Sequence, residues 1–220
     1  DSLPAGTNAQ ARVKPIYEQV EILHRLFPEL YTGQGFMPYA YRIPEGAEGL
    51  FAIPSWQKLA PTYGEAVERV LAKIAEQRPF HNWLEGGLDA GHLRQTEHTV
   101  AMWKRLTGTS DAAIFLIPAQ FGLRYRDKSV QEARAAFTDN EFGLGAYEVG
   151  IMLLTHPERL QNYNDLWIDA PGDEFSFADG DFSLAPIFHF YDGKVKFHAY
   201  WYAHAHGYYG SASAFLPQYH

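Results

Sequence analysis

Asp192-Gly193 stands between two runs in which apolar and polar side chains alternate, residues 187–191 and 194–202. Alternation with a period of two is typical of strands, and Asp-Gly is a preferred pair for the type I′ turn that joins two antiparallel strands. This turn predicts that Tyr191 pairs with Lys194, and it fixes the register of the rest of the hairpin. The chain must therefore contain an antiparallel sheet near its C-terminal end.

The period of two also divides the side chains of the hairpin between two faces. We expect a core face formed by Phe188, Phe190, Val195, Phe197 and Trp201. The opposite face, here called the histidine face, carries His189, Tyr191, Lys194, Lys196, His198, Tyr200, Tyr202, His204 and His206. His189 and His198 are expected about 7 Å apart as diagonal neighbours. A solvated sheet face is the favoured interpretation, and a ligand surface that uses His189, His198 and Tyr200 is the alternative.

The same spacing argues against a four-histidine metal site. His198 and His204 are six residues apart, which is about 20 Å along a straight strand. Zinc needs three or four ligands, and the chain has no cysteine. We therefore expect no cofactor and no tightly bound zinc, and a weak metal site at His204 and His206 is the alternative.

Glu148 is the only charged residue in the segment 142–154. On a helix it shares a face with apolar residues, so partial burial is expected. A buried carboxyl has a raised pKa and can act as an acid or a base, which makes Glu148 the candidate catalytic residue. The favoured alternative is that Glu148 points outward or pairs with an arginine.

Two other segments carry clustered charge. Arg124 and Arg126 point the same way in an extended chain and can clamp a carboxylate or phosphate, although pairing with surface acids is the favoured interpretation. The acidic residues of 169–174 and 179–181 are oxygen ligands of the type that Ca²⁺ and Mg²⁺ prefer. Their spacing does not match an EF-hand, so a solvated acidic turn is expected there.

Helical periodicity and capping signals dominate the first two thirds of the chain, and strand signals dominate the last. Helices are expected at 16–27, from Thr62 to before Pro79, between Asp89 and Gly108, and from Ser129 onward. Strands are expected at 36–43, 49–53, 112–117 and 166–168, besides the hairpin. These elements predict one α+β domain over residues 1–220, with a helix-rich part (1–160) packed on a mainly antiparallel sheet from a strand-rich part (161–220).

The composition excludes several functional classes. With 18 Lys and Arg against 26 Asp and Glu, the net charge of −8 disfavours binding to nucleic acid. No apolar run is long enough to span a membrane, and the first residues do not resemble a signal peptide, so we expect no membrane partner and take the cytoplasm as the default compartment. Phosphate-loop, zinc-protease and serine-hydrolase motifs are absent.

The segments 117–122, 140–145 and 155–160 resemble uncharacterised bacterial open reading frames. The resemblance covers roughly the C-terminal half of the chain. It implies a bacterial or mobile-element origin and assigns no catalytic residue.

Two functions from different classes follow. The first is a ligand- or partner-binding role through the Tyr- and His-rich face, which we favour because aromatic residues are enriched in interfaces. The second is a small-molecule enzyme with Glu148 as acid or base and Arg124 and Arg126 as an anion clamp. The sequence indicates neither the ligand nor the oligomeric state.

Overall fold

The computed structural model describes residues 12–33, 41–178 and 180–219. Its helices are α1 (Ile16–Leu26), α2 (Tyr63–Gln77), α3 (Glu97–Thr107), α4 (Val130–Ala136) and α5 (Ala146–Thr155). Short 3-10 helices are η1 (Pro28–Leu30), η2 (Trp56–Lys58), η3 (Leu123–Tyr125) and η4 (Pro157–Arg159). The strands are β1 (Tyr41–Arg42), β2 (Gly49–Pro54), β3 (Phe80–Asn82), β4 (Leu93–Gln95), β5 (Ile114–Gln120), β6 (Glu141–Gly143), β7 (Trp167–Asp169), β8 (Asp173–Phe175), β9 (Leu184–Tyr191), β10 (Lys194–Trp201), β11 (Tyr209–Ser211), β12 (Ser213–Phe215) and β13 (Gln218–Tyr219).

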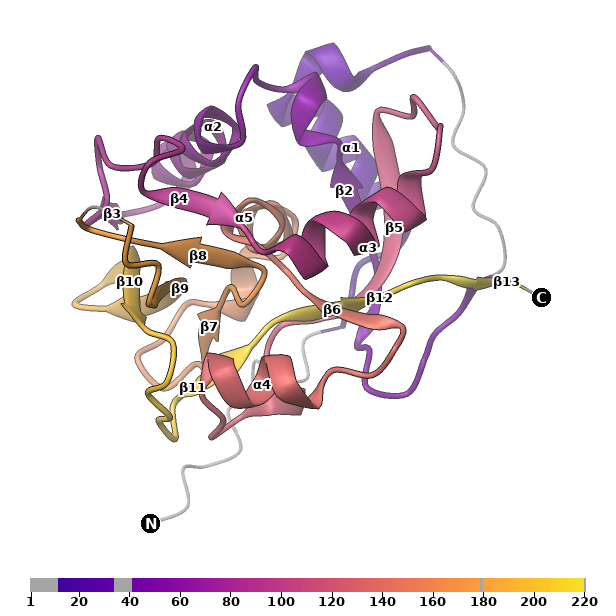
Figure 1. Ribbon diagram of the computed structural model, residues 1–220. Coiled ribbons are helices and arrows are strands. Elements are labelled where there is room, and N and C mark those ends of the chain that lie inside the picture. Colours follow the sequence, from indigo (N-terminus) through magenta and orange to yellow (C-terminus); the bar gives the residue numbers. More distant parts are fainter. Residues whose placement is uncertain (1–11, 34–40, 179, 220) are drawn as a thin grey trace.

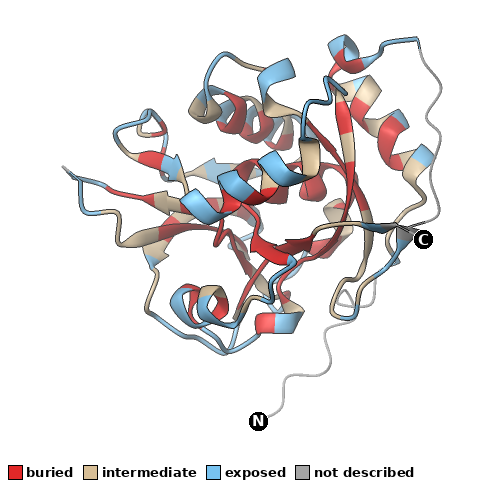
Figure 2. Cartoon of the chain, turned by 45° about the vertical axis from the view of Figure 1, so that its right-hand side comes forward, coloured by how far each residue is buried: buried red, intermediate tan, exposed pale blue. Residues whose placement is uncertain are grey.

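Helix α5 forms the centre of the core (Figure 1). All ten of its residues are buried, as expected for a helix that is apolar on every side. It packs against α1, α2 and β2, and buried residues concentrate on it and on the inner strands (Figure 2). A Cβ at Gly150 would lie 2.6 Å from Val70 Cγ1, so the close approach of α2 to α5 requires a glycine there.

Two larger sheets lie around this helix. One has the strand order β2-β5-β12-β6, and the other has the order β11-β7-β9-β10-β3, with β8 and then β4 attached beside β9. A third, two-stranded pairing joins β1 to β13. The first sheet is antiparallel, whereas the second also contains the parallel pairs β10-β3 and β11-β7.

The predicted hairpin is confirmed. Strands β9 and β10 pair antiparallel with Tyr191 opposite Lys194 and Ile187 opposite His198. Asp192 and Gly193 have φ values of 53° and 71°, the positive values that a type I′ turn requires. Because directly opposed residues share a face, this register places His189 and His198 on the same side of the sheet.

The expected arrangement of helices and strands is wrong, although the chain is α+β. The helices are interspersed with strands, and β2 to β6 all precede residue 160. The sheet β2-β5-β12-β6 takes three strands from the first two thirds of the chain and only one from the last. The physical reason is that the apolar run of β5 pairs on one side with β2 and on the other with β12 from the C-terminal third, so strands from both parts of the chain form one sheet.

Local differences follow the same cause. The helix expected between Asp89 and Gly108 begins only at Glu97, because residues 93–95 pair with β8 instead. Its buried residues are Thr99 and Met102, whereas Val100 is 48% exposed. The strand expected at 49–53 is confirmed as β2. For the strand expected at 36–43, residues 36–40 lie outside the described residues. Among the described residues, no helix has the length and apolar character needed to cross a membrane.

Candidate functional site

Glu148 lies in the first turn of α5 and is only 2% exposed. The backbone N–H of Gly145 donates a hydrogen bond to Glu148 Oε2 at 3.0 Å, so the carboxyl caps the helix of which it is part. Burial disfavours the ionised form and raises the pKa of Glu148 to about 7, against the lowering effect of the N–H groups of Glu148 itself, Gly145 and Trp103. Glu148 therefore exchanges its proton near neutral pH.

A second buried carboxyl, that of Asp173 on β8, lies at the same helix end. It accepts hydrogen bonds from the Ala146 N–H at 2.7 Å and from the Tyr63 hydroxyl at 2.8 and 2.9 Å. Burial, and then the charge of Glu148, raise the pKa of Asp173 well above its usual value. A Cβ at position 145 would lie 2.5 Å from Asp173 Oδ1, so only glycine leaves room for this pair of carboxyls.

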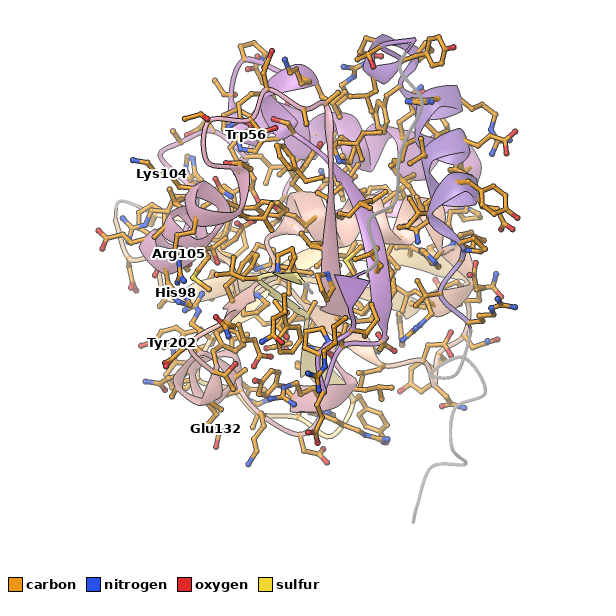
Figure 3. The ribbon with its side chains drawn as sticks, turned by 90° about the vertical axis from the view of Figure 1, so that its right-hand side faces the viewer. Trp56, His98, Lys104, Arg105, Glu132 and Tyr202 are labelled. Carbon is orange, nitrogen blue, oxygen red and sulfur yellow. The ribbon has the colours of Figure 1, made fainter. Side chains whose placement is uncertain are left out.

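A cavity of about 300 Å³ opens beside Glu148, between α3 and the segment that follows β2. It is lined by Ile53, Pro54, Ser55, Trp56, Gln57, Gln95, Val100, Trp103, Lys104, Thr107, Phe115, Tyr147 and Glu148. Four of these are large aromatic residues, and Glu148 is the only acidic one. We call this space the Glu148 cavity. Figure 3 shows Trp56 and Lys104, from its two walls, on the same side of the molecule.

Two buried polar groups of the cavity differ in their hydrogen bonding. The Tyr147 hydroxyl donates to the Pro54 carbonyl at 2.9 Å. Trp103 Nε1 is buried and has no hydrogen-bond partner within normal geometry among the described residues, although its N–H lies close enough to Glu148 to lower the pKa of that carboxyl. The cavity therefore has an unused donor next to a protonatable carboxyl.

The structure does not bring the two arginines to this cavity. Arg124 Nε lies 3.1 Å from Oε1 of the buried Glu141 and 3.2 Å from the Tyr125 hydroxyl. Arg126 is exposed, and its Nε donates to the Gly207 carbonyl at 3.3 Å. Arg124 is thus occupied by an internal acid, and neither side chain lines the Glu148 cavity.

His189 is not part of a solvated face. It is 5% exposed, and its ring centroid lies 4.1 Å from that of Trp167. Neither ring nitrogen has a hydrogen-bond partner among the described residues. Burial, followed by the positive charge of Lys196, lowers the pKa of His189 to about 4, so the imidazole is neutral at neutral pH.

His198 and Tyr200 belong to a row of rings on the same face. The ring centroids of His198 and Tyr200 are 5.0 Å apart. We call this row the aromatic strip; it comprises Trp83, Phe177, His198, Tyr200 and Tyr209. Trp83 stacks on His198 at 5.8 Å, and Tyr200 stacks on Tyr209 at 6.0 Å. Trp83 is 54% and Phe177 58% exposed, so the strip reaches the solvent.

Trp201, expected in the core, is 59% exposed at the end of β10.

The remaining candidate ligands of a metal are dispersed. The rings of His204 and His206 are exposed and 6.1 Å apart. Within the described parts of the chain, no three His, Asp or Glu residues are grouped to hold a metal ion. The solvated acidic turn expected at 169–174 and 179–181 is wrong for Asp169 and Asp173, which are 4% and 0% exposed, whereas Asp181 is exposed and Asp179 lies outside the described residues.

Sequence reasoning found Glu148 and missed the residues around it. Asp173 was assigned to a surface turn because acidic residues beside Pro and Gly usually lie in loops. Trp103 lies within the helix expected between Asp89 and Gly108, and nothing in its spacing links it to Glu148. Both reach Glu148 only through long-range packing, which a single sequence does not encode locally.

Comparison of the chain with protein-family models, with curated proteins and with solved structures finds no match.

Proposed function

We propose that the protein is a small-molecule enzyme that uses the Glu148 cavity, with Glu148 as its general acid and base. The observation that carries this proposal is a buried carboxyl with a pKa of about 7 that lines a cavity with four large aromatic side chains and no other acidic residue. Concave apolar sites with few polar groups and a perturbed pKa are the usual position of small-molecule chemistry. An anion clamp formed by Arg124 and Arg126 is not part of the proposal, because Arg124 is paired with Glu141.

The pKa matters because a proton donor or acceptor works best when both of its forms are populated at the working pH. Burial is the cause that raises the pKa of Glu148, and the charge of Glu148 in turn raises the pKa of the neighbouring Asp173. The volume of about 300 Å³ is at the lower end for ligand pockets, so the ligand is a compact one.

The test uses the five tryptophans as reporters, because only Trp56 and Trp103 line the cavity. A set of small ring compounds is added to ¹⁵N-labelled protein, and the indole N–H resonances are recorded. Binding in the cavity moves the signals of Trp56 and Trp103 and leaves that of Trp201 unchanged. Compounds that move only Trp83, Trp167 or Trp201, or none of the five, would contradict the proposal.

The enzyme part of the proposal needs a second readout. In any turnover found by screening substrate mixtures, Glu148→Gln lowers kcat by about a hundredfold or more, because Gln keeps the shape and exchanges no proton. Trp201→Ala, which alters an exposed tryptophan outside the cavity lining, is the control and leaves kcat unchanged. Equal activity of Glu148→Gln and the unaltered protein would refute the role of Glu148.

The second candidate function is binding of a protein partner through the aromatic strip. It is favoured by the exposure of Trp83 and Phe177 on either side of His198. Exposed clusters of large aromatic side chains mark interaction surfaces. The chain carries a net charge of −8, yet the strip itself contains no carboxylate. We take a second copy of the chain as the partner, because the same exposed rings on two copies can bury each other.

A further inference from the structure

The Glu148 cavity holds a specific pattern of hydrogen-bond donors at its inner end. Trp103 Nε1 carries a hydrogen that lies close enough to the Glu148 carboxyl to lower its pKa, yet no described acceptor takes this hydrogen up in normal hydrogen-bond geometry. An indole N–H can only donate. Glu148 Oε2 already accepts from Gly145, which leaves Oε1 as the atom that carries the proton of the neutral carboxyl. In that state both groups offer a hydrogen and neither offers a free, charged acceptor.

Buried donors without partners are costly, so a ligand that satisfies both gains affinity from each. The group that accepts two hydrogens at one point is an oxygen with two lone pairs. The same low polarity that keeps Glu148 neutral penalises a charged ligand group at this depth. An ionised carboxylate is therefore disfavoured, and so is an ammonium group, which would require Glu148 to ionise.

The outer part of the cavity sets the body of the ligand. Its walls are the rings of Trp56, Phe115 and Tyr147 and the side chains of Ile53 and Val100. This apolar part of the lining favours a ring or a short hydrocarbon body, and Ser55, Gln57, Gln95 and Thr107 add polar groups to the rest of the lining. Lys104 also lines the cavity, and its side chain is exposed to solvent. Solvent therefore screens the charge of Lys104 and weakens its attraction for a ligand group beside the buried donors.

We propose that the Glu148 cavity binds uncharged carbonyl compounds with an apolar body, and that the carbonyl oxygen accepts hydrogen bonds from Trp103 Nε1 and from the protonated Glu148 carboxyl. This inference rests on the proposed function and names its substrate class. It assigns Trp103 a role in ligand recognition, through the one buried donor of the cavity that has no partner in the described chain.

The experiment compares four probes of similar size: acetophenone, ethylbenzene, benzoate and benzylamine. Dissociation constants are taken from the indole shifts of Trp56 and Trp103 at about pH 6 and about pH 8. Acetophenone is expected to bind best and about tenfold more tightly at the lower pH, because it binds the fraction of protein with Glu148 protonated. Ethylbenzene has the same shape without the oxygen and is expected to bind more weakly at pH 6, with no pH dependence.

Two variants test the donors separately. Glu148→Gln keeps a donor that does not titrate, so acetophenone binds it equally at both pH values. Trp103→Phe removes the indole hydrogen and weakens acetophenone several-fold, as the loss of one hydrogen bond does, while ethylbenzene binding changes little. The signal of Trp56 reports binding in this variant, and thermal unfolding checks that both variants are folded.

The outcomes separate this inference from the proposed function. Tight binding of benzylamine that strengthens with rising pH, preferred binding of benzoate, or equal affinities for acetophenone and ethylbenzene would overturn the carbonyl assignment and leave a small-molecule site in place. Failure of all four probes to move Trp56 and Trp103 would count against the cavity as a binding site, and hence against the proposed function itself.

Discussion

At the scale of single residues, Glu148 combines a structural and a chemical role. Its Oε2 satisfies the Gly145 N–H at the start of α5, and its burial keeps the other oxygen protonated near neutral pH. A neutral side chain of the same shape satisfies the same N–H without the penalty of ionisation. The stability of the fold must therefore depend on pH through this one carboxyl.

The direction of that dependence follows from the pKa. Glu148 has a pKa of about 7 when folded and a model value of 4.5, so the folded protein binds the proton more tightly than the unfolded chain. Stability from this group is present below pH 4.5 and is lost as the pH rises to about 7. We expect Glu148→Gln to gain up to about 3 kcal/mol in unfolding free energy, relative to the unaltered protein, between those two pH values.

Urea unfolding at a series of pH values measures this difference. Gln57→Ala, which alters another residue of the cavity lining, serves as the control and should shift stability by the same amount at every pH. A difference between Glu148→Gln and the unaltered protein that does not change with pH would mean that folding leaves the pKa of Glu148 unshifted.

At the scale of elements, the sequence was most informative where the pattern was local. The β9-β10 hairpin was predicted down to its register, because Asp192-Gly193 fixes the turn and the alternation fixes the faces. The strand β4 was missed because three residues carry no period, and β4 exists only through its pairing with β8. The same limit explains why Glu148 could be found from the sequence and Asp173, which meets it from a distant strand, could not.

The turn of this hairpin gives a prediction for Gly193. Its φ of 71° lies in the region that side chains with a Cβ disfavour, and nothing crowds the position. Gly193→Ala is therefore expected to destabilise the fold by about 1–2 kcal/mol through backbone strain alone. Thermal unfolding measures this, with Gly87→Ala as the control, since Gly87 has no positive φ and its nearest neighbour, the Leu84 carbonyl, would be 3.5 Å from an added Cβ. Equal effects of the two substitutions would argue against the turn.

At the scale of the whole molecule, the acidic net charge and the aromatic strip act in opposite directions. Charge repulsion keeps copies of the chain apart, and the exposed rings favour their association. Composition indicated the abundance of aromatic residues, but it did not reveal that Trp83 and Phe177, far apart in sequence, meet at His198. Their meeting depends on the parallel pairing of β3 with β10, which no local pattern predicts.

Self-association through the strip is tested by sedimentation velocity. The unaltered chain is expected to form dimers, more readily at high salt, where repulsion between acidic copies is screened. The double substitution of Trp83 and Phe177 by Ala should yield monomers. Trp201→Ala removes an equally exposed ring that points to the other face of the sheet, and it should leave the dimer intact. Monomers of the unaltered chain at all concentrations and salts would exclude this partner.

The two sides of the Glu148 cavity belong to helices of very different burial. Every residue of α5 is buried, whereas α3 has only two buried residues. Amide hydrogens of α5 should exchange with solvent only when the whole chain unfolds, and those of α3 through smaller, local openings. A molecule in the cavity would contact both helices and stabilise the packing of α3 next to the fully buried helix α5. Occupancy should therefore appear in hydrogen exchange as slower exchange along α3, with the exchange of α5 changed only as far as global stability rises.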